Sequence, residues 1–185
     1  MRVGANGKRR INILKTFLVT RAIDTLEKDS EERQEVISRL LYYFDRDKIC
    51  QPYLFPKTFV DLQQQHWDPI VEWAKERYDV KIELSETDFR YLQLTEAKDK
   101  FRAIVNAFDG LKLSAFERAT ILSNSFLIAL GLVEKRLGVE EAVSAASTET
   151  NAWIMTWGNV ELALDSDQDQ LRQQLQSVAY LLVDG

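Results

Sequence analysis

Apolar residues recur along most of this chain at steps of three and four, the spacing that places them on one face of an α-helix. Such stripes predict helices over residues 11–29, 30–45, 57–78, 97–110, 114–133, 139–157 and 171–182. A Ser-x-x-Glu capping box at Ser114 and Glu117 predicts the start of the helix over 114–133. Its second half, 121–133, is apolar almost all round, which favours a central buried helix. The pattern therefore predicts a mainly α fold, a single bundle-like domain of about seven helices.

The predicted helix over 57–78 contains an interruption at Asp68-Pro69, inside the stretch QHWDPIVEWA. Proline within a helix removes one backbone donor and clashes with the preceding turn, at a cost of about 3 kcal/mol or more. Asp before Pro also suits a new helix start, with Asp as the cap and Pro as the first helical residue. The segment therefore predicts a junction or a sharp kink that turns Trp67 and Trp73 in different directions.

A second pattern, strict alternation of apolar and polar residues, covers residues 80–85. Alternation is typical of a strand with one buried face, but one strand cannot make a sheet. Residues 80–85 are thus half of a short strand pair, a strand that pairs with a region outside this sequence, or an extended linker.

Charge is distributed unevenly along the 185 residues. Residues 1–23 hold six basic and no acidic side chains, whereas the remainder has 18 basic and 29 acidic ones, a balance of −11. Such an acidic body repels phosphate backbones, which disfavours nucleic-acid binding. Residues 1–10 are predicted to be a basic tail or the remnant of an interdomain junction, with an organelle transit segment as the alternative. Residues 11–185 are predicted to be the helical domain.

Candidate reactive groups are few, since the chain has one cysteine and one histidine. Cys50 cannot form an internal disulfide, and His66 cannot build a histidine-based metal cluster. Nucleophilic catalysis would require these two residues to meet. The longest uncharged apolar run, 120–133, is shorter than a membrane span. We expect no catalytic residue, metal or cofactor, and no membrane insertion.

The segment Trp157-Gly158-Asn159-Val160-Glu161 admits two interpretations. In the first, Trp157 is a core residue and Gly158 ends the helix in a left-handed conformation. In the second, Gly158 ends the helix so that Glu161 projects from a short loop, where charges held by a rigid scaffold serve recognition.

Several segments together resemble a known family, the mitochondrial and alphaproteobacterial assembly chaperones that bind the alpha subunit of the ATP synthase catalytic head. The resemblance covers about residues 11 to 180 and rests on five segments. These are Ala22-Ile23-Asp24, Asp47 to Cys50, Phe59 to Tyr78 with its WDPI core, Ser125 to Ala142, and Trp157 to Glu161.

The resemblance implies a non-enzymatic helper of the mitochondrial matrix that keeps the unassembled alpha subunit from aggregating until beta subunits replace it. It also implies that the chain corresponds to the helical C-terminal domain, without the family's N-terminal β-rich domain. We expect a monomer with no cofactor. The expected partner-binding residues are Glu161, Trp157, Gly158, Trp67, Asp68, Pro69 and Trp73.

The sequence departs from the family pattern in three places. Leu164-Asp165 stands where His-Asp is usual, Trp153 where glutamine is usual, and Thr150 or Asn151 where an acid is common. These departures concern details of the binding surface. The helical pattern alone is equally compatible with an adaptor or scaffold protein that has another protein partner.

Overall fold

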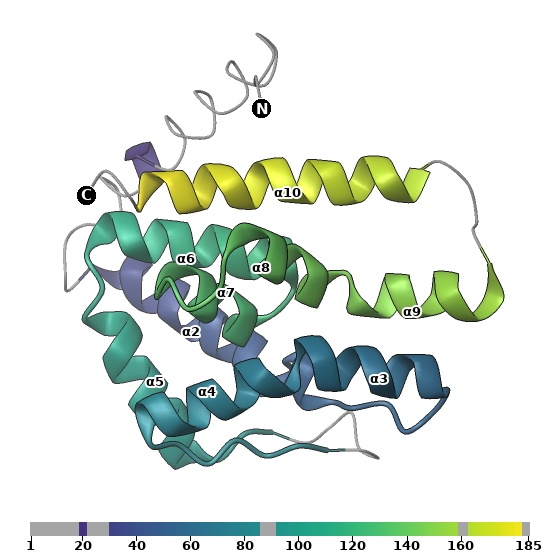
Figure 1. Cartoon of the computed structure of the whole chain (residues 1–185). Coiled ribbons are helices and arrows are strands. Elements are labelled where there is room, and N and C mark those ends of the chain that lie inside the picture. The colour runs from purple at the N-terminus through teal and green to yellow at the C-terminus, as the bar shows by residue number, and fades with distance from the viewer. Residues whose placement is uncertain (1–18, 22–29, 86–91, 159–162, 183–185) are drawn as a thin grey trace, which may run out of the picture.

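The computed structural model describes residues 19–21, 30–85, 92–158 and 163–182, whose regular structure is helical (Figure 1). The elements are α2 (Glu31–Asp45), the short 3-10 helix η1 (Lys48–Cys50), α3 (Lys57–His66), α4 (Asp68–Tyr78), α5 (Thr95–Asn106), α6 (Gly110–Ser123), α7 (Phe126–Val133), α8 (Val139–Ala146), α9 (Thr148–Trp157) and α10 (Ala163–Leu181). The predicted mainly α fold is confirmed, and no strand occurs within these ranges. The predicted tail and most of the predicted first helix lie outside them, although residues 19–21 are helical.

The centre of the fold is α7, and all eight of its residues are buried. Helices α2, α4, α6 and α8 pack against it. The Phe126 ring lies 5.3 Å from the ring of Phe44, 5.2 Å from Phe101 and 5.0 Å from Phe116, measured between centroids. A helix that is apolar all round needs this complete enclosure, so the prediction of a central helix is confirmed.

The single helix predicted over residues 114–133 is wrong, because the chain breaks between α6 and α7. Asn124 adopts a left-handed conformation with φ of 52°, which ends α6. The Ser125 hydroxyl then accepts a hydrogen bond from the Ile128 amide at 3.1 Å and caps α7. A second break at Ser147 divides the helix predicted over 139–157 into α8 and α9. These breaks, with the one at Trp67, divide the six helices predicted within the described ranges into nine α-helices.

The predicted capping box at Ser114 and Glu117 is also wrong. Helix α6 begins earlier, after Asp109, whose carboxylate accepts from the Lys112 amide at 2.8 Å. Ser114 and Glu117 are buried within the helix. The Glu117 carboxylate instead pairs with the guanidinium groups of Arg21 and Arg39.

Residues 80–85 form an extended segment and not a strand. Val80 and Ile82 are buried while Lys81 faces solvent, but Leu84 is 46% exposed, so the buried face covers only the first half of the segment. The place of a partner strand is taken by a side chain. The Gln93 amide accepts from the Glu83 N–H at 3.1 Å and donates to the Glu83 carbonyl at 3.0 Å. Within the described residues the segment is therefore extended and unpaired with any strand.

Candidate functional site

The break between α3 and α4 lies at Trp67, which ends the first helix and begins the second. Its amide donates to the Gln63 carbonyl at 2.8 Å, and its carbonyl accepts from the amides of Ile70 and Val71 at 3.0 and 3.1 Å. Asp68 and Pro69 are therefore the first two residues of α4. The predicted junction is confirmed, but Asp68 lies one position inside the helix and no side chain caps its start.

The Trp67 side chain lies in the core with 1% of its surface exposed. Its indole N–H donates to the Ala145 carbonyl at 2.9 Å, which links the break to the end of α8. A buried tryptophan needs such an acceptor, since an unpaired indole N–H is costly. Trp67 thus fixes the position of the neighbouring exposed residues and does not itself reach the surface.

The other predicted partner-binding residues of this segment have different environments. Asp68 and Pro69 are exposed. Partial burial and then the nearby Glu72 carboxylate raise the pKa of Asp68. Trp73 is half-buried and packs edge-on against Tyr78, with ring centroids 5.7 Å apart. The break therefore turns Trp67 inward and leaves Trp73 at the margin of the core.

Helices α3 and α9 lie side by side at one end of the fold (Figure 1). Their aromatic side chains, together with Tyr53 of the loop before α3, form a continuous row of ring contacts. We call Tyr53, Phe59, Trp153 and Trp157 the aromatic row. Successive ring centroids are 4.8, 6.3 and 4.1 Å apart. Phe59 is the buried member of the row, whereas Tyr53 is 44% exposed and the two tryptophans are each 57% exposed.

The aromatic row is held in place by polar contacts between the same elements. The Thr58 and Thr156 hydroxyl groups are 2.5 Å apart and bridge α3 and α9. The Tyr53 hydroxyl donates to the Glu149 carboxylate at 3.1 Å. The loop after Tyr53 also exposes Leu54 and Phe55, at 68% and 79%. A scaffold that keeps several apolar side chains in water is typical of an interaction surface.

The first interpretation of the segment Trp157 to Glu161, with Trp157 in the core, is wrong. Trp153 and Trp157 both face solvent, and the buried residues of α9 are Thr148 and Ala152. Gly158 follows with φ of 88°, and its amide donates to the Ile154 carbonyl at 2.8 Å. The predicted helix end at Gly158 is confirmed. Glu161 lies outside the described residues.

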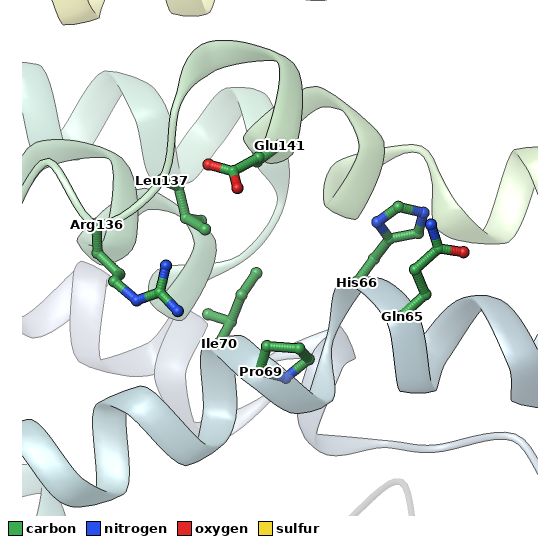
Figure 2. A pocket seen from close by; sticks show the side chains of 7 residues that line it. All are labelled: Gln65, His66, Pro69, Ile70, Arg136, Leu137 and Glu141. Atoms are coloured by element: carbon green, nitrogen blue, oxygen red, sulfur yellow. The ribbon is translucent and has the colours of Figure 1, made fainter.

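A hollow of about 210 Å³ lies where the α3–α4 break faces the turn between α7 and α8 (Figure 2). Its lining residues are Gln65, His66, Pro69, Ile70, Arg136, Leu137 and Glu141. Burial lowers the pKa of His66 below its ordinary value of 6.5, so the imidazole is mainly neutral at pH 7. The His66 ring lies on the wall of this hollow (Figure 2).

The two residues considered for nucleophilic chemistry have separate environments. Cys50 is buried in η1, and burial together with Asp47 raises the pKa of its thiol well above the ordinary value. It is not among the residues that line the hollow with His66. Within the described ranges, no group of three His, Cys, Asp or Glu side chains has the arrangement of a metal site. No helix in those ranges has the length and apolar character of a membrane span.

The fold and its surface features define an all-α domain with apolar and charged side chains exposed on its surface. The sequence pattern described as ATP12 chaperone protein matches residues 8–75. The mitochondrial protein atp12 of Schizosaccharomyces pombe is 26% identical over 188 residues, which span 97% of this chain and 64% of that protein.

Solved structures show the same fold over nearly the whole chain. The Atu1473 protein of Agrobacterium tumefaciens is 26% identical and superimposes with a TM-score of 0.80, covering 94% of this chain and 64% of the other. Atp12 of Paracoccus denitrificans is 18% identical with a TM-score of 0.77, covering 90% and 71%. The chain is thus similar to ATP12 chaperone proteins in sequence over residues 8–75, and it shares the fold of the solved bacterial Atp12. It spans about 64% of the length of the curated relative.

Proposed function

We propose that this protein is a chaperone for assembly of the ATP synthase catalytic head, which binds the unassembled alpha subunit and prevents its aggregation. The similarity to ATP12 chaperone proteins supports the general class. The mitochondrial location of the fission yeast relative supports a mitochondrial location, for which we propose the matrix. We further propose that residues 11–185 form the client-binding domain, that residues 1–10 belong to a basic tail or junction, and that the protein is a monomer without enzymatic activity.

The observation that carries the proposal is the aromatic row. An assembly chaperone must cover an apolar surface that would otherwise aggregate, and it must later release it. Exposed aromatic side chains supply much of the energy of such interfaces because they bury large areas at a small cost in conformational entropy. Trp153 and Trp157 are held by their contacts with Phe59 and with each other, so little ordering is needed on binding.

The charge of the chain favours a client with basic stretches around its apolar surface, because the net charge is −5. Trp157 and Gly158 lie at the end of the aromatic row, and Glu161 follows three positions later in the sequence. We propose that Glu161 contacts the alpha subunit directly and that Trp157 and Gly158 set the path of the chain toward it. Asp68, Pro69 and Trp73 would form a second part of the contact, positioned by the buried Trp67.

The test is a light-scattering assay of the isolated alpha subunit diluted from denaturant, with and without this protein. We expect suppressed aggregation at a near-equal molar ratio. Unchanged scattering would contradict the proposed function. Binding of the alpha subunit without any effect on its aggregation would instead support an adaptor or scaffold.

The role of Glu161 is tested in the same assay with Glu161→Lys, and Glu35→Lys serves as the control. Glu35 is an exposed residue of α2, so both variants reverse one charge. We expect Glu161→Lys to lose protection with an unchanged melting temperature, and Glu35→Lys to keep it. A collapse of the melting temperature in Glu161→Lys would make the residue structural.

A further inference from the structure

The hollow at the α3–α4 break has walls that the local sequence holds in fixed positions. On one side, Pro69 lacks a backbone N–H and therefore cannot continue the hydrogen-bond ladder of α3. The neighbouring Trp67 is fixed through the Ala145 carbonyl. This arrangement leaves His66 at the end of α3 and Ile70 in α4 on the same wall (Figure 2).

The opposite wall is the turn that follows α7. Lys135 has φ of 59°, and the Gly131 carbonyl accepts from the amides of Arg136 and Leu137 at 2.8 and 3.0 Å. A methyl group at Gly131 would lie 2.8 Å from Leu137 Cδ1, so glycine is what allows Leu137 to fold back over α7. Leu137 thereby joins the floor of the hollow, and Arg136 extends over it from the side opposite His66 (Figure 2).

Only some of the polar side chains that line the hollow make hydrogen bonds within the protein. The Glu141 carboxylate accepts from the Gly138 amide at 2.7 Å and caps the start of α8. The Arg136 guanidinium and the His66 ring, by contrast, make no side-chain hydrogen bond or ion pair with any residue in the described ranges. Arg136 is exposed, so it contributes nothing to the core. A guanidinium at the mouth of a hollow with an apolar floor has the chemistry of a carboxylate receptor, since its fork of N–H groups matches two carboxylate oxygens.

We propose that this hollow binds one acidic side chain, Glu or Asp, of a partner polypeptide. The carboxylate pairs with Arg136 and accepts a hydrogen bond from His66, while the methylene groups lie on Ile70 and Leu137. A side chain within a polypeptide suits the site better than a free anion, because the floor is apolar and the volume of about 210 Å³ is small and open to the surface. That the partner is the client of the chaperone rests on the function proposed above, whereas carboxylate binding does not.

His66 provides a direct readout, because it is the only histidine of the chain. Its ring signals can be followed by proton NMR during titration with N-acetyl-glutamate methylamide. We expect a saturating shift and a rise in the pKa of His66, since a nearby carboxylate favours the charged imidazolium. The uncharged analogue N-acetyl-glutamine methylamide should bind more weakly by about tenfold or more, as expected for loss of a charge-assisted pair.

Two matched variants assign the effect to the hollow. Arg136→Gln should abolish saturation, and Arg102→Gln, at an exposed position of α5, should not. Equal responses to the glutamate and glutamine compounds, or an unchanged titration of Arg136→Gln, would overturn the proposal. Tighter binding of succinate than of the glutamate compound would also overturn it, in favour of a free dicarboxylate.

The light-scattering assay separates this proposal from the proposed function. If Arg136→Gln protects the alpha subunit less well than Arg102→Gln does, the hollow takes part in client binding. If wild-type protein gives no protection while the NMR titration saturates, the proposed function fails and the carboxylate site stands. Protection by wild type without any NMR response would overturn only the carboxylate site.

Discussion

Replacement of both exposed tryptophans in the aromatic row, Trp153→Gln with Trp157→Gln, is the perturbation most specific to the proposed client surface. A tryptophan buries roughly 150–250 Å² when fully enclosed. With 57% of each side chain exposed, roughly 85–140 Å² per residue remains for a partner to cover. At about 25 cal/mol per Å², complete coverage would contribute about 2–3.5 kcal/mol for each tryptophan.

Coverage is incomplete in most interfaces, and binding has entropic costs, so we expect the double variant to lose about 3 kcal/mol in total. That loss corresponds to a Kd for the isolated alpha subunit about a hundredfold weaker. Biolayer interferometry with immobilised alpha subunit measures it. The fold should survive, because both side chains lie at the surface and the substitutions leave the core around α7 unchanged.

The matched control is Ile121→Gln, which removes an apolar side chain that is 46% exposed on α6. It should leave the Kd within about twofold, a difference well below 1 kcal/mol. An equal loss of affinity in Ile121→Gln, or an unchanged Kd in the double variant, would refute the assignment of the client surface to the aromatic row.

Three further predictions concern the scaffold. Burial raises the pKa of Asp47 to about 6 from an ordinary value of 3.8, so its contribution to stability is complete below about pH 3.8 and is lost as the pH rises through 6. Urea denaturation should show wild type losing about 3 kcal/mol relative to Asp47→Asn between about pH 3.5 and pH 7, and parallel pH profiles would contradict this. Arg33→Met removes hydrogen-bond donors to the carbonyls of Asn106 and Phe108, which lie at 2.9 and 2.7 Å. It should lower the free energy of unfolding by about 3 kcal/mol in the same assay. A loss below about 1 kcal/mol would mean that these carbonyls find other partners. Lys135→Gly relieves a left-handed residue with φ of 59° and should raise stability by about 0.5–1 kcal/mol, seen as a higher melting temperature, and a lower one would contradict it.

Helix positions were largely predictable because burial of one face imposes a period on the sequence. The stripe Val36, Ile37, Leu40, Leu41 and Phe44 is buried on α2 as predicted. The breaks were harder. The break at Trp67 was predictable from Pro69, because proline lacks the backbone N–H that a continuous helix needs. The breaks at Asn124 and Ser147 arise from backbone conformations that many sequences adopt, so no residue pattern predicts them.

The candidate site was predictable only in part. The helix end at Gly158 follows from local chemistry, whereas the exposure of Trp153 and Trp157 does not. Tryptophans four positions apart have the same spacing on a buried stripe and on an exposed one, and tertiary packing decides between them. Tyr53 and Arg136 gave no sequence signal, because their roles depend on which distant segments pack beside them.

Hydrogen exchange followed by mass spectrometry, on this protein alone and saturated with isolated alpha subunit, tests whether the aromatic row binds the client. We expect slower amide hydrogen exchange in the complex for residues 51–59, in the loop and the start of α3, and for residues 150–158 at the end of α9. Protection confined to α5 and α10, with no change around the aromatic row, would contradict it.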